Sequence, residues 1–107
     1  MYNRGDVYLV QEGQGQGSEI QKTRPWVLVG ATPLNKARST VIAVPLTTKQ
    51  REIPGLCIKI LLNNTAGIAV LDQIRALDKS RLIRKEGSVN TFELDMIDDG
   101  LKQILCL

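Results

Sequence analysis

Short apolar runs separated by polar, turn-forming segments make up most of the chain. Runs of about four to eight apolar residues bounded by Gly, Pro, Asn or Asp are typical of β-strands. The run Trp26-Val27-Leu28-Val29 is apolar at every position, which indicates a buried strand. The pattern predicts strands at residues 7–10, 26–31, 40–46, 55–62, 68–76 and 83–89.

The connections between these runs differ in character. Residues 11–22 contain three glycines and little that could be buried, so they are predicted to form a mobile flap. Residues 32–39 read as a turn-rich, basic loop, and residues 78–82 as a short helical turn capped by Asp78.

The last part of the chain changes to a helical period. Asn90 and Glu93 have the spacing of a capping box. Five apolar residues beyond it fall on one helical face: Leu94, Ile97, Leu101, Ile104 and Leu105. Five or six short strands followed by one helix predict a mainly β fold, a small, strongly bent sheet or barrel with a C-terminal helix.

Composition agrees with one globular domain spanning residues 1–107. The apolar fraction of 43% and the charged fraction of 23% are ordinary for a soluble, ordered protein. No apolar run approaches the roughly 18 residues that a membrane span needs, and the N-terminus lacks the apolar region of a secretory signal. We therefore expect a cytoplasmic protein without a membrane partner.

Charge and missing residue types narrow the chemistry. Residues 1–85 carry thirteen of the fourteen lysines and arginines but six of the eleven acids, which favours a polyanionic partner. There is no histidine, which excludes Ser-His-Asp and Cys-His catalysis and the usual zinc sites. Cys57 and Cys106 both have apolar neighbours and are predicted to be buried thiols. The chain is expected to need no metal and no cofactor.

Three polar groups at strand ends could carry chemistry. Arg24 precedes Pro25, which favours an extended backbone, and a guanidinium held there can bind a phosphate or carboxylate. Thr47 follows the strand 40–46, and the alternative interpretation is that its hydroxyl only satisfies a turn. Asp72 interrupts an apolar run, and its alternative role is a core hydrogen bond or an ion pair with Arg75 or Arg24.

These motifs together resemble the MazF/PemK family of toxins. The resemblance is carried by Arg4-Gly5-Asp6-Val7-Tyr8, by Gly17-Ser18-Glu19 leading to Thr23-Arg24-Pro25-Trp26, by Val44-Pro45-Leu46-Thr47-Thr48, and by the segment from Asp72-Gln73-Ile74-Arg75 to Leu82. They occur in the family's order and spread over nearly the whole chain. The resemblance implies the toxin half of a bacterial type II toxin–antitoxin pair. It also implies an SH3-like barrel with a C-terminal helix, of the plasmid-maintenance toxin type, assembled as a homodimer.

The implied activity is metal-independent cleavage of single-stranded RNA, mostly mRNA, at short sequences. The 2′-hydroxyl attacks the adjacent phosphate, which leaves a 2′,3′-cyclic phosphate and a 5′-hydroxyl. The cognate antitoxin is expected to cover the RNA groove with an acidic, disordered tail.

The family's catalytic pair maps onto Arg24 and Thr47. RNA contacts are expected from six further residues: Ser18, Glu19, Thr48, Asp72, Gln73 and Arg75. The general base stays open among Asp72, Glu19 and another group, because Ser18 stands where some members of the family have a histidine. Two other interpretations stay open as well. One is a toxin of the same barrel that poisons gyrase, and the other is a barrel that binds nucleic acid without cutting it.

Overall fold

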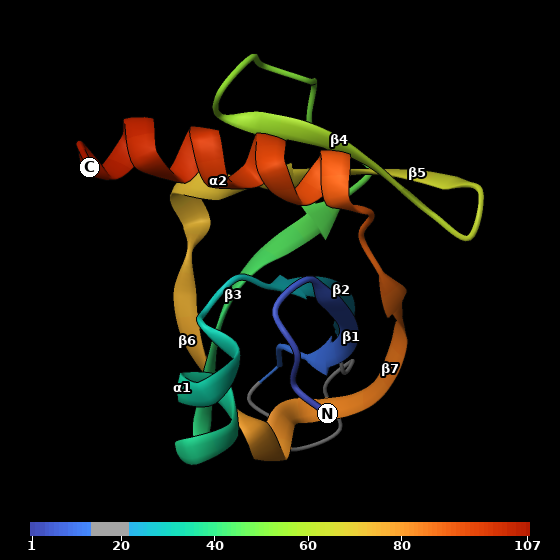
Figure 1. The fold of residues 1–107 in the computed structure, drawn as a ribbon. Coiled ribbons are helices and arrows are strands. Elements are labelled where there is room, and N and C mark those ends of the chain that lie inside the picture. Colours follow the sequence, from blue (N-terminus) through green and yellow to red (C-terminus); the bar gives the residue numbers. More distant parts are fainter. Residues whose placement is uncertain (14–21) are drawn as a thin grey trace.

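A strongly bent sheet with a helix across one end forms the molecule (Figure 1). The computed structural model describes residues 1–13 and 22–107. Within them the elements follow in the order β1 (Asp6–Gln11), β2 (Thr23–Leu28), α1 (Thr32–Ala37), β3 (Thr40–Thr47), β4 (Cys57–Leu62), β5 (Thr65–Val70), η1 (Leu71–Gln73), β6 (Arg75–Asp78), η2 (Lys79–Arg81), β7 (Leu82–Ser88) and α2 (Thr91–Leu105). The predicted mainly β fold with a C-terminal helix is confirmed.

Strand β3 is the centre of the sheet. The strand order is β4-β5-β3-β2-β1-β7, with β6 paired to β3. Ala43 faces Leu28 of β2 on one side and Arg75 of β6 on the other. Further along, Thr47 faces Ile68 of β5. One strand therefore brings the ends of β2, β5 and β6 into the same region.

The predicted strand at residues 68–76 is interrupted. Leu46 faces Ala69 and Ala43 faces Arg75, so three steps along β3 are matched by six steps along the opposite chain. The excess is taken up by the single 3-10 turn η1. The sequence of this segment favours a continuous strand, but three extra residues opposite β3 interrupt it. These extra residues can be recognised only when the pairing with β3 is known.

Apolar residues fill two cores, one on each face of β2. Val27 packs in the core that α2 closes, together with Ile97 and Leu101 of that helix. Trp26 and Leu28 pack in the second core, on the other face of β2. The apolar run in this strand follows from burial on both faces, as its sequence indicated.

The predicted capping box opens α2 and also ties it to the sheet. The Asn90 side chain accepts a hydrogen bond from the Glu93 N–H at 2.7 Å, and Glu93 accepts from the Asn90 N–H at 2.9 Å. The second carboxylate oxygen of Glu93 accepts from the Leu61 N–H of β4 at 2.9 Å. The predicted apolar face is buried at Ile97 but exposed at Leu105, where the helix ends.

Two further sequence predictions were wrong. Residues 32–39 contain the helix α1 instead of only a loop, with a proline in its first turn and the buried Asn35 donating to the Gly30 carbonyl at 2.9 Å. Cys57 is buried as predicted, but Cys106 is exposed, because it lies just beyond the end of α2. Neither helix of the described chain has the length and apolar composition that a membrane crossing requires.

Candidate active site

Arg24 lies within strand β2, whereas the sequence placed it just before the strand. β2 begins at Thr23, three residues before the predicted start, and Arg24 faces Val10 of β1. The pairing with β1 fixes the backbone of Arg24, while its side chain is 38% exposed. The backbone of Arg24 is therefore held in place by strand pairing, while its guanidinium can still be reached by an external anion.

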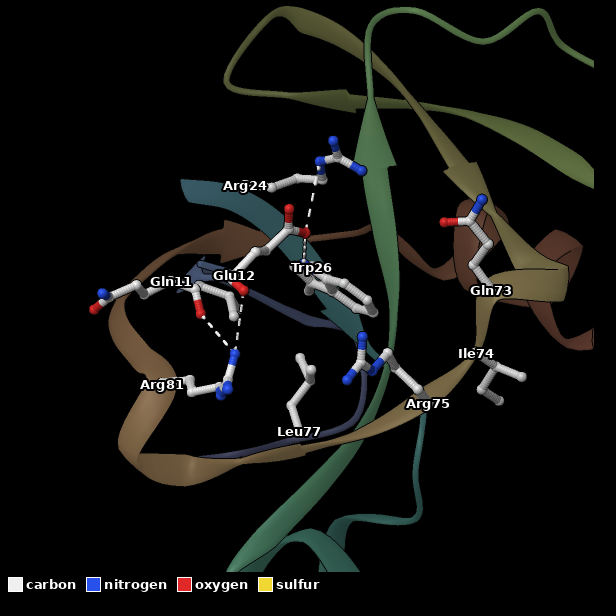
Figure 2. Close-up of a pocket in the computed structure, with 10 residues that line it drawn as sticks. Gln11, Glu12, Arg24, Trp26, Gln73, Ile74, Arg75, Leu77 and Arg81 are labelled. Atoms are coloured by element: carbon white, nitrogen blue, oxygen red, sulfur yellow. Dashed lines mark hydrogen bonds and ion pairs between the residues drawn. The ribbon is translucent and has the colours of Figure 1, made fainter. Parts of the chain in front are cut away.

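Arg24 lines two neighbouring cavities. The first has a volume of about 470 Å³ and is lined on its polar side by Arg24, Glu12, Gln73, Arg75 and Arg81. Figure 2 shows these side chains around the edge of Trp26, with Arg24 and Arg75 on opposite sides of the ring. The second cavity, of about 280 Å³, is lined by Arg24, Thr47, Thr48 and Lys49 and by apolar side chains. Arg24 is the residue through which the two cavities meet.

Thr47 ends β3 and faces the second cavity. Its hydroxyl oxygen accepts a hydrogen bond from the Lys49 N–H at 3.2 Å. Thr47 therefore does make the turn contact that the alternative interpretation assigned to it. A hydroxyl that accepts one bond can still donate its hydrogen. The turn contact therefore orients Thr47 without using up the group, and Thr48 is exposed beside it.

The remaining predicted residues separate into three groups. Gln73 and Arg75 line the first cavity together with Arg24. Asp72 is exposed in η1 and lines neither cavity, and in the described part of the chain it forms no ion pair with Arg75 or Arg24. Its charge acts on Cys57 instead: burial, and secondarily the nearby Asp72 carboxylate, raise the pKa of that thiol. Ser18, Glu19 and most of the predicted flap lie outside the described residues.

Glu12 lines the first cavity beside Arg24, although the sequence did not single it out. Its carboxylate oxygen Oε2 accepts a hydrogen bond from the Trp26 indole N–H at 2.7 Å and lies 3.6 Å from Nε of Arg24. Arg81, also missed, donates from Nη1 to the carbonyl of Glu12 at 3.3 Å. The Glu12 N–H donates to the Lys22 carbonyl at 2.8 Å. Pairing the two predicted strands as a hairpin would have placed Glu12 close to Arg24.

The arrangement suits a phosphodiester. Three guanidiniums line one cavity, and a hydroxyl faces the next, so a phosphate at Arg24 meets donors from both sides. Among the residues that the structure describes, no group of three or more cysteine, aspartate or glutamate side chains could hold a metal ion. The chemistry that these residues themselves offer is anion binding and charge stabilisation.

Comparison with known proteins supports the family that the sequence resembles. The family of PemK-like, MazF-like toxins of type II toxin–antitoxin systems matches residues 3–105. Endoribonuclease MazF9 of Mycobacterium tuberculosis is 30% identical over 112 residues, which cover 95% of this chain and 94% of the relative.

Solved structures agree. An endoribonuclease from a mycobacterial species, in complex with its cognate antitoxin, is 29% identical with a TM-score of 0.78, and the match covers 98% of this chain and 95% of that one. A MazE–MazF structure from Deinococcus radiodurans has a TM-score of 0.84 at 19% identity, covering 98% and 96% of the two chains. The fold predicted from the resemblance is therefore confirmed. From the match over residues 3–105, this chain belongs to the family of PemK-like, MazF-like toxins of type II toxin–antitoxin systems.

Proposed function

We propose that this chain is a sequence-specific, metal-independent endoribonuclease toxin that cuts single-stranded RNA, mainly mRNA, in the cytoplasm. Relatives that carry the name endoribonuclease support this activity. The observation that carries the proposal is the position of Arg24 between two cavities, with Thr47 in one and Gln73 and Arg75 in the other. A strand of RNA that crosses Arg24 would place one phosphate at the guanidinium and its neighbouring nucleotides in the two cavities.

The reaction needs little from the protein beyond placement, charge stabilisation and proton transfer. The 2′-oxygen bonds to phosphorus, the bond from phosphorus to the 5′-oxygen breaks, and a 2′,3′-cyclic phosphate remains. Arg24 donates to the non-bridging oxygens as their negative charge grows, an effect worth about 3 kcal/mol. Thr47 donates to a phosphate oxygen and holds the in-line geometry.

Two protons move in this step: a general base takes one from the 2′-hydroxyl, and a general acid gives one to the departing 5′-oxygen. The carboxylates considered as bases are Asp72 and Glu19. Asp72 lines neither cavity, which argues against it, so Glu19 is the first to test. Thr48, Gln73 and Arg75, with Ser18 and Glu19, are proposed to contact the bases, since single-stranded RNA exposes base edges to amide and guanidinium groups.

The proposed protein partners are a second copy of this chain and a cognate antitoxin with an acidic, disordered tail. Structures of relatives in complex with their antitoxins support the second partner. The guanidiniums of Arg24, Arg75 and Arg81 give an acidic tail a complementary surface at the proposed RNA site.

The test is to incubate the protein with a long single-stranded RNA in EDTA and to map the new ends by sequencing. We expect cuts at a short shared sequence. Arg24→Ala and Thr47→Ala should each cut at least about 100-fold more slowly. Arg84→Ala and Thr91→Ala, which change the same residue types at exposed positions elsewhere, should cut like the parent. Intact RNA would favour gyrase poisoning or binding without cleavage, and cleavage by Arg24→Ala at the parent's rate would remove Arg24 from the mechanism.

A further inference from the structure

A carboxylate lies beside the arginine to which the proposed function assigns phosphate binding. We propose that Glu12 is a positioning residue that holds the Arg24 guanidinium in the orientation for the scissile phosphate. This inference rests on the proposed function.

Glu12 is fixed from several sides and is not a free surface acid. Its N–H and C=O are bonded to Lys22 and Arg81 across the start of the segment that joins β1 and β2. Its side chain is 23% exposed, and Oε2 is anchored at 2.7 Å by the indole N–H of Trp26, which is 4% exposed. The buried ring of Trp26 therefore fixes the position of the Glu12 carboxylate.

The contact with Arg24 leaves the reactive end of the guanidinium open. Glu12 approaches the Nε side at 3.6 Å, a distance that makes an ion pair but not a hydrogen bond. Figure 2 shows the two terminal nitrogens of Arg24 pointing away from Glu12. Fixing a long side chain before the substrate arrives lowers the entropy lost when the phosphate is bound.

A purely structural ion pair would have a different signature. A half-exposed ion pair contributes little to stability, so Glu12→Gln, which keeps an acceptor for the Trp26 indole N–H, should leave the fold intact. A negative charge beside the phosphate site also opposes RNA binding. Glu12 should therefore act on kcat through the orientation of Arg24, and its removal should not raise KM.

The test compares kcat and KM for RNA cleavage in Glu12→Gln, Glu12→Ala, Trp26→Phe and the double variant Glu12→Ala/Trp26→Phe. Glu12→Gln keeps an oxygen for the indole and loses the charge, so it carries the decision. We expect kcat to fall about 10-fold in Glu12→Gln and up to about 100-fold in Glu12→Ala, with KM unchanged or lower. The matched control is Glu86→Gln, which breaks an Arg84 Nε–carboxylate pair of 3.0 Å on β7 and should leave kcat within about twofold.

Because Trp26 acts through Glu12, the double variant should lose no more than Glu12→Ala alone. A product of the two single losses would overturn the inference, as would Glu12→Gln with the kcat of the control or with a raised KM alone. A readout without RNA is the ¹⁵N spectrum, in which Glu12→Gln should move the Arg24 Nε–H resonance and Glu86→Gln should not. Unchanged Arg24 resonances would also overturn it. A parent that leaves RNA intact would instead refute the proposed function, a different result from Glu12 variants that cut normally.

Discussion

At Gly100 of α2, helix propensity and tertiary packing favour different residues. Propensity favours alanine, whereas the close packing of the helix against its neighbours favours glycine. A glycine within a helix costs about 1 kcal/mol relative to alanine, so Gly100→Ala should stabilise the isolated helix by that amount. In the folded chain, however, a Cβ at this position would lie 2.3 Å from Cδ1 of Leu71 and 2.7 Å from the carbonyl oxygen of Gly55. Leu71 is fully buried, and Gly55 has a φ of +78°, so neither can move aside at low cost.

Overpacking of this kind costs about 1–3 kcal/mol, and the contact with backbone argues for the upper part of that range. Subtracting the gain in helix propensity leaves a net loss of about 1–2 kcal/mol in the free energy of unfolding. The displaced Leu71 begins η1, which ends at Gln73 in the first cavity. We therefore also expect a higher KM for RNA.

Urea unfolding followed by far-UV circular dichroism measures the stability change. Asp99→Ala is the control, because it also raises helix propensity but at an exposed position, and its unfolding free energy should change by no more than about 0.5 kcal/mol. A Gly100→Ala variant that is more stable than the parent by the full propensity gain would refute the reasoning about close packing at this position.

Three further outcomes follow from the same structure. Cys106 should react with a thiol reagent in the native protein, whereas Cys57 should react only after unfolding, because burial and a raised pKa both suppress its thiolate; equal rates would contradict this. Glu93→Ala should destabilise the protein by about 2 kcal/mol or more in urea, since it removes a capping contact and leaves the Leu61 N–H without its acceptor, and Glu93→Gln should recover part of that loss. Arg75→Ala should weaken RNA binding and lower the slope of log K against log salt by about 0.7, the value for one phosphate contact to a single strand; an unchanged slope would exclude such a contact.

Sequence reasoning succeeded where a local pattern and the tertiary structure demand the same thing. The all-apolar run of β2 is buried on both faces, and the capping box of Asn90 and Glu93 forms with both of its bonds. The structure also brings Arg24, Thr47, Gln73 and Arg75 to two adjoining cavities, because β3 brings three strand ends together, and their roles in RNA binding and cleavage stay predictions.

The misses share a different physical origin. The break at η1 is an excess of three residues opposite β3, which is visible only once the partner strand and its register are known. α1 has no side-chain cap, and the proline in its first turn is equally typical of a loop, so the sequence does not mark its start clearly. In the sequence Glu12 belongs to a glycine-rich segment, and its proposed role depends on contacts with Trp26 and Arg24 across a hairpin. Propensity and motif describe neighbours along the chain, whereas these features come from neighbours in space.

The most direct measurement of the central claim is mass spectrometry of the products from a short RNA that contains the mapped cleavage sequence, digested in EDTA. The proposed function predicts one cut that leaves a 2′,3′-cyclic phosphate and a 5′-hydroxyl, and no cut in the same RNA when the single nucleotide that supplies the attacking 2′-hydroxyl is replaced by its 2′-deoxy form. Cleavage of the 2′-deoxy substrate, or a product with a 5′-phosphate, would contradict the account of how Arg24 and Thr47 act.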